Sequence, residues 1–303
     1  MLSDTRKQER IGELFILAQA ALYGFLPIIA NYATKLMPPV LFAGVCTSIA
    51  ALCLLPYIIF TGQIRHLLDK KTLLLLGGIT LFIVVIPSIF VFIGTSKTSS
   101  INTTILLQTE LLFTFIICGI FAGEKITLHK GLGALVLLIG ATTVLYQGGL
   151  KLNWGDLLIV IGTSFYPIGN ILSKKALDLT TPVIILFFRS AFGGAMLIAF
   201  SLMFERYDAT PFEYIKNNLG SILVCTILVY LISKLFWYQG LKRIKISQAT
   251  AISICMPAFG LFYAVIFLGE IPTLYQVAGL VVIIAGLVLL THQKSKHYEV
   301  MSR

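Results

Sequence analysis

Three ionisable side chains lie well inside long apolar runs, and together they could bind a small charged solute. Glu110 lies in ILLQTELLFTFII, Arg189 in VIILFFRSAFGG and Lys234 in LVYLISKLFWY. In segments that cross a bilayer, a central charge costs roughly 2.5–3.5 kcal/mol, so such residues usually face a water-filled cavity or one another. The two cations could hold a carboxylate or a phosphate, while Glu110 could bind an amine or carry a proton. A second interpretation stays open: Glu110 forms a structural ion pair with Lys234 or Arg189 that only neutralises itself.

Aromatic and amide side chains near these charges are the next candidates. Aromatic faces hold flat or cationic ligands through contacts worth about 0.5–2 kcal/mol. Amide groups can bind a polar solute, although they also link neighbouring helices in membranes. The candidate substrate-binding residues beyond the three charges are therefore Tyr23, Tyr166, Gln108, Asn170, Trp237 and Tyr238.

Three prolines inside the apolar runs have a mechanical interpretation. Pro27, Pro167 and Pro257 each remove a backbone hydrogen bond and can kink a helix. They are candidate hinge or gating residues, and static curvature is the alternative.

The elements that position these residues are predicted to be membrane-spanning helices. The chain is 57% hydrophobic and 12% charged, with a mean hydropathy of +0.93, which leaves too little polar surface for a soluble protein of 303 residues. Several apolar runs have the length of about 20 residues that a helix needs to cross a bilayer. We predict ten spans, at 13–34, 40–62, 73–95, 101–122, 129–146, 155–175, 182–204, 218–240, 247–268 and 274–291.

An internal repeat relates the two halves of the chain. The segment 94–145 recurs as 240–291 at a constant offset of 146, with 12 identical residues among 52 aligned positions. Such a repeat indicates two homologous halves. Weaker similarity at an offset of 143 matches Gly12-Glu13 with Gly155-Asp156, Tyr23 with Tyr166, and Pro39 with Pro182. We predict a first half at 1–146, an external linker at 147–154, a second half at 155–291 and a cytoplasmic tail at 292–303.

Lysine and arginine residues in the predicted loops indicate the orientation. Sixteen of them lie on the termini and the even-numbered loops, and five lie on the other loops. Because short cytoplasmic loops concentrate Lys and Arg, both termini are predicted to be cytoplasmic. Five helices per half then make the repeat inverted, which is a recurrent plan of transporters. The net charge of +10 is explained by basic loops facing anionic lipid, and it requires no nucleic-acid partner.

Two short motifs carry a resemblance to a known family. Gly-Glu-Lys-Ile-Thr at 123–127 and Gly-Glu-Ile-Pro-Thr at 269–273 each end a predicted helix, and Pro257 lies thirteen residues before Glu270. This pattern resembles the EamA domain of the drug/metabolite transporter superfamily, and the resemblance covers nearly the whole chain as two repeats. The first half departs from it, because Leu111 occupies the position equivalent to Pro257.

The resemblance implies where a site and a partner would lie. In the family, helices one to four and six to nine surround a central cavity, and an arginine early in helix seven is matched here by Arg189. Helices five and ten lie outside the cavity and often contribute to dimer contacts, so a homodimer through the spans 129–146 and 274–291 is an expectation. Glu124 and Glu270 are expected to cap or anchor helix ends.

Motifs of enzymes, metal sites and cofactor sites are not found in the sequence. The five cysteines have no C-x-x-C spacing, and there is no HExxH, Gly-x-Ser-x-Gly or phosphate-cradling loop. We therefore predict an all-α membrane protein of ten transmembrane helices in two inverted five-helix repeats. No catalytic residue, metal or cofactor is expected.

The expected function is secondary transport across the inner or plasma membrane. A small polar metabolite would move by alternating access through a central cavity, and an amino acid or similar zwitterion would match one acid and two bases. Two alternatives remain open. One is a carrier for the uptake of an amine or cation, and the other is a non-transporting scaffold or lipid-handling subunit.

Overall fold

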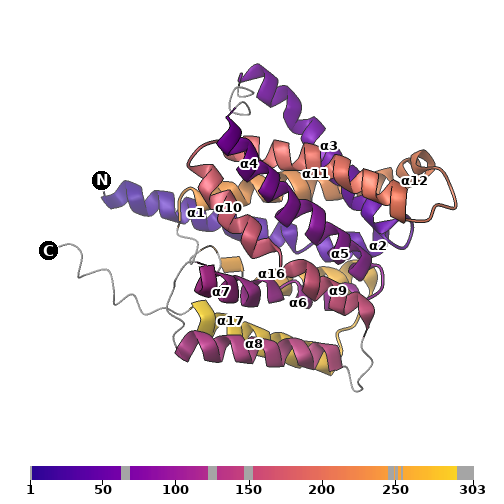
Figure 1. Cartoon of the computed structure of the whole chain (residues 1–303). Coiled ribbons are helices and arrows are strands. Elements are labelled where there is room, and N and C mark those ends of the chain that lie inside the picture. The colour runs from indigo at the N-terminus through magenta and orange to yellow at the C-terminus, as the bar shows by residue number, and fades with distance from the viewer. Residues whose placement is uncertain are drawn as a thin grey trace.

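The computed structural model describes residues 2–62, 69–121, 128–146, 153–244, 249, 252–253 and 255–291. This part of the chain is helical, without β-strands (Figure 1). Within it, six helices are long and apolar enough to cross a membrane: Lys7–Ala33, Pro39–Phe60, Lys70–Thr95, Trp154–Leu177, Pro182–Phe204 and Leu219–Leu241. Three shorter apolar helices are Gly131–Val144, Met256–Leu268 and Leu274–Leu289. Residues 147–152 of the predicted linker, the tail 292–303 and Glu124 lie outside the described residues.

Several predicted spans consist of two or three helical pieces. The first half contains α1 Leu2–Tyr23, α2 Leu26–Ala33, α3 Pro39–Phe60, α4 Lys70–Ile79, η2 Thr80–Val85, α5 Ile86–Thr95, α6 Ser100–Leu106, α7 Thr109–Phe121 and α8 Leu128–Tyr146. The second half contains α9 Trp154–Thr163, α10 Tyr166–Leu177, α11 Pro182–Phe204, α12 Pro211–Asn217, α13 Leu219–Val224, η3 Cys225–Ser233, α14 Lys234–Leu241, α16 Met256–Tyr263, η4 Ala264–Leu268 and α17 Leu274–Thr291. The elements η2, η3 and η4 are π-helical.

The three candidate hinge prolines mark helix breaks. Pro27, Pro167 and Pro257 each lie in the first two positions of a helical piece, namely α2, α10 and α16. A proline is tolerated there because the first N–H groups of a helix have no partner within the helix. The fourth predicted span also breaks, between α6 and α7, although it contains no proline. The role of the three prolines as hinges stays a prediction.

The breaks correct part of the sequence alignment between the halves. Phe-Leu-Pro-Ile at 25–28 and Phe-Tyr-Pro-Ile at 165–168 both open the second piece of a broken helix, at an offset of 140. Tyr166 therefore corresponds to Leu26, and the predicted match with Tyr23 at an offset of 143 is wrong. The physical reason is that the stretch from Gly12 to Pro27 is three residues longer than the stretch from Gly155 to Pro167.

Glycine contacts show that the two halves are interlocked. A Cβ atom on Gly94 of α5 would lie 2.6 Å from the Gly155 carbonyl oxygen of α9, and one on Gly240 of α14 would lie 3.3 Å from the Gly12 carbonyl oxygen of α1. The repeat makes the two contacts equivalent. Gly240 corresponds to Gly94 at an offset of 146, and Gly155 corresponds to Gly12 at an offset of 143. In each contact, the first span of one half packs closely on the third span of the other.

Helices α8 and α17 form a closely packed pair along one side of the bundle (Figure 1). A Cβ atom on Gly140 would lie 2.7 Å from the Ile283 backbone nitrogen, and one on Gly286 would lie 2.6 Å from the Leu137 nitrogen. These glycines therefore serve a contact within one chain. The predicted homodimer through the same helices would have to use their other faces, where Leu135 is exposed, and it stays a prediction.

Replacing Gly140 with alanine is expected to destabilise the protein by about 1–3 kcal/mol, because the added methyl overpacks the α8–α17 contact. Gly131→Ala on the same helix is the matched control, since its Cβ would meet no atom within 4 Å. That control should be neutral or stabilising by up to about 1 kcal/mol. Thermal unfolding in detergent measures both variants, and a Gly140→Ala protein as stable as the Gly131→Ala protein would contradict the assigned packing.

Candidate functional site

The three charges predicted from the sequence lie near one another. Glu110 is in the first turn of α7, Arg189 lies in α11, and Lys234 opens α14. The charge of Lys234 interacts electrostatically with those of both Glu110 and Arg189. Yet within the described part of the chain no carboxylate oxygen lies within 4.0 Å of a side-chain nitrogen of Lys234 or Arg189. The structure thus shows neighbouring charges without a closed ion pair.

Glu110 is positioned by the break between α6 and α7. Its Oε1 atom accepts a hydrogen bond of 2.9 Å from Nδ2 of Asn170 on α10. The first turn of a helix also favours a negative charge, because the helix dipole is positive at that end. Next to the α6–α7 break, the hydroxyl groups of Thr109 and Thr163 are hydrogen-bonded at 2.8 Å. This bond joins the α6–α7 break to the break between α9 and α10. Two broken helices from different halves therefore present Glu110.

Lys234 and two tyrosines form the next part of the site. The Lys234 Nζ atom lies 3.5 Å from the centroid of the Tyr23 ring, which is a cation–π contact. Tyr23 is the last residue of α1, and its hydroxyl lies near that of Tyr166, the first residue of α10. Lys234 directly follows the π-helical η3, a type of irregularity that is frequent at functional sites. Helix breaks thus position these residues as well.

Arg189 is the most buried of the three charges. Its side chain is 5% exposed, and its Nε atom has no hydrogen-bond partner. The guanidinium carbon lies 5.9 Å from the centroid of the buried Tyr238 ring. Gln108 Nε2 in the α6–α7 break is also buried and unpartnered. Leaving a buried donor unpaired costs about 1–3 kcal/mol, so both donors would gain from an acceptor group of a bound molecule.

The charged site is not sealed within an apolar core. Glu110, Lys234, Tyr23, Tyr166 and Asn170 are all only half-buried. Each of these side chains therefore keeps part of its surface accessible.

Trp237, another residue predicted to bind the substrate, has a different environment. Its ring packs against the apolar clusters that contain Ile16 and Ile185. Its role in binding stays a prediction, and the contacts of the ring are those of a packing residue.

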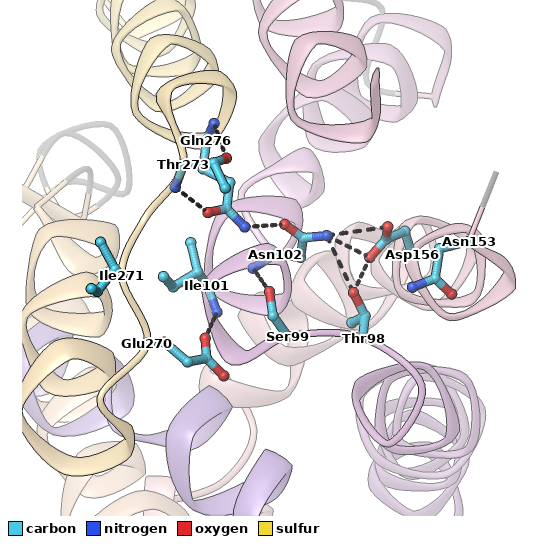
Figure 2. Close-up of a pocket in the computed structure, with 10 residues that line it drawn as sticks. All are labelled: Thr98, Ser99, Ile101, Asn102, Asn153, Asp156, Glu270, Ile271, Thr273 and Gln276. Atoms are coloured by element: carbon cyan, nitrogen blue, oxygen red, sulfur yellow. Dashed lines mark hydrogen bonds between the residues drawn. The ribbon is translucent and has the colours of Figure 1, made fainter. Parts of the chain in front are cut away.

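A second polar cluster, which the sequence did not reveal, lies at the start of α6 and α9 (Figure 2). Asn102 is its centre: its Nδ2 atom donates to the Asp156 carboxylate at 3.2 Å, and its Oδ1 atom accepts from Gln276 Nε2 at 2.7 Å. Thr98 Oγ1 donates to Asp156 Oδ1 at 2.5 Å. These residues line a cavity of about 390 Å³. The repeat match of Asp156 with Glu13 was the one signal in the sequence that pointed to this position.

Glu270 borders the same cavity and caps a helix, as predicted. Its carboxylate accepts hydrogen bonds from Ser100 N at 3.2 Å, Ser100 Oγ at 2.8 Å and Ile101 N at 3.1 Å. These are donors at the beginning of α6, which the helix itself leaves unpaired. Because the carboxylates of Glu270 and Asp156 have their own donors, we assign this cluster to joining α6, α9 and α17.

Both halves of the chain match one protein family. The model of the EamA-like transporter family matches residues 10–146 and again residues 153–292. The chain belongs to this family. EamA-like proteins are transporters, so the chain is a member of a family of multi-pass membrane transporters.

Individual relatives agree with this assignment. The chain is 24% identical over 272 residues to YyaM of Bacillus subtilis strain 168, described as an uncharacterized transporter, and the match covers 85% of this chain and 86% of YyaM. It is 27% identical over 261 residues to a probable amino-acid metabolite efflux pump of Salmonella typhimurium strain LT2, with 83% and 85% covered. A solved crystal structure has a TM-score of 0.65 at 16% identity, and the match covers 92% of this chain and 95% of that chain, which shows that the two proteins share a fold.

Replacing Asn102 with alanine is expected to lower the stability by about 1–3 kcal/mol, because Asp156 and Gln276 each lose a buried partner. Asn217→Ala is the matched control, since Asn217 is exposed at the end of α12. Thermal unfolding in detergent compares the two. Equal midpoints for Asn102→Ala and Asn217→Ala would show that the cluster does not hold the helices together.

Proposed function

We propose that the chain is a secondary transporter that moves a small polar metabolite, an amino acid or similar zwitterion, by alternating access through a central cavity. The observation that carries this proposal is the cluster of Arg189, which is buried, with Glu110 and Lys234, which are half-buried; the described residues show no closed ion pair among them. Ionisable residues inside membrane spans mark solute or ion pathways, and each is by default a functional-site hypothesis. The relative named a probable amino-acid metabolite efflux pump supports the solute class.

We propose ten transmembrane helices in two inverted repeats for the topology. The six long spans, together with α6–α7, α8, α16–η4 and α17, would supply them. The loop charges support cytoplasmic termini in the inner or plasma membrane. Inverted repeats with broken helices around a central site suit alternating access, because the halves can exchange their conformations.

The site residues have complementary roles in this proposal. Arg189 and Lys234 bind the carboxylate of the solute, and Glu110 with Asn170 binds its amine. Simple amine uptake would give Arg189 and Lys234 no acidic group on the solute to bind. A scaffold or lipid-handling subunit would leave the three charges without a use.

Uptake of a labelled metabolite library into proteoliposomes, with and without a pH gradient, tests the proposal. The variants Glu110→Gln, Arg189→Gln and Lys234→Gln should each reduce uptake at least about tenfold, because each leaves a charged group of the solute unpaired. Matched controls at exposed positions are Glu9→Gln, Arg206→Gln and Lys175→Gln, and they should transport normally.

Size-exclusion chromatography and thermal unfolding first establish that each variant is folded. Normal uptake by all three site variants would refute the assigned site. An unmodified protein that moves nothing from a broad library would refute transport and favour the scaffold alternative.

A further inference from the structure

The charges of the site do not balance. Counted by residue type, Arg189 and Lys234 carry two formal positive charges, and Glu110 carries one formal negative charge. In the described residues, neither cation has a carboxylate within 4.0 Å. Asp156 and Glu270 belong to the separate cluster and are held by their own hydrogen-bond donors. A net charge of +1 in surroundings of low polarity favours binding of an anion.

We propose that the transported solute is a carboxylate with a net charge of −1, and that an acidic amino acid fits the site best. This proposal rests on the transport function proposed above and narrows its substrate class. A neutral amino acid would leave the site at +1, and an amine would raise it to +2. A solute of charge −1 makes the occupied site neutral.

The hydrogen-bonding groups also favour a solute rich in acceptor oxygens. The buried atoms without a partner include Arg189 Nε and Gln108 Nε2, which are both donors. The ammonium of Lys234 contacts the Tyr23 ring and retains its N–H donors for a further acceptor. Carboxylates accept several hydrogen bonds and form stronger ones with charged donors than neutral groups do.

The arrangement matches two carboxylates and one amine. Arg189 lies near Tyr238, whereas Lys234 lies on Tyr23, so each cation is supported by a different aromatic ring. Each could hold its own carboxylate. Glu110, which uses one oxygen for Asn170, provides the one acidic group for an amine. A monocarboxylate without an amine would neutralise the site but leave Glu110 unused.

Uptake of labelled solutes into proteoliposomes tests this inference. Uptake of L-glutamate, L-alanine and lactate is compared for the unmodified protein, Lys234→Gln and the exposed control Lys175→Gln. The unmodified protein should prefer glutamate to alanine at least about tenfold, and Lys234→Gln should reduce this ratio about tenfold because it removes one positive charge. Lys175→Gln should keep the original ratio.

A second variant separates charge from folding. Arg189→Lys retains the charge of the site and should keep the preference for glutamate, whereas Arg189→Gln should reduce it. Stabilisation of each purified protein by glutamate and by alanine in a thermal-shift assay gives a readout that does not depend on transport. The unfolding midpoint of each variant measured without solute identifies variants that have lost their fold.

The outcomes distinguish the two proposals. Uptake of lactate but not glutamate would support the net charge of −1 and reject the amine role of Glu110. Uptake of neutral amino acids with neither anion transported would overturn the inference while the proposed transport function stands. Absence of any transport or binding across the metabolite library would overturn both.

Discussion

A charged side chain inside a bilayer costs several kcal/mol unless water or a partner reaches it, and this cost determines how the bundle is built. Glu110 receives a hydrogen bond from Asn170 and lies at the beginning of α7, while Lys234 lies on the Tyr23 ring. Each compensation depends on a helix that stops and restarts inside the bundle. An unbroken helix would place no helix N-terminus at Glu110.

Close glycine contacts hold together the spans that carry these breaks. Broken helices expose backbone groups, which must be satisfied by neighbouring protein in a membrane. The paired contacts of Gly94 with Gly155 and of Gly240 with Gly12 hold the spans of opposite halves together. Polar links such as Thr109 with Thr163 then join the breaks directly. Both halves consequently contribute to the candidate site. The first half supplies Glu110, and the second half supplies Lys234.

The sequence predicted the parts of this arrangement that depend on local chemistry. Charges in apolar runs identified Glu110, and prolines identified three of the four helix breaks. The break before α7 was missed because Gln108 and Thr109 carry no local signal for it. The Asn102 cluster was missed because Gln276 lies 174 residues away, and only the fold brings such residues together.

The most direct test is an electron cryomicroscopy structure of the protein with the solute that it transports. The account predicts solute density beside Glu110, with a carboxylate within hydrogen-bond distance of Arg189 or Lys234. A solute bound in the cavity beside Asp156, or elsewhere without contact to any of the three charges, would contradict it.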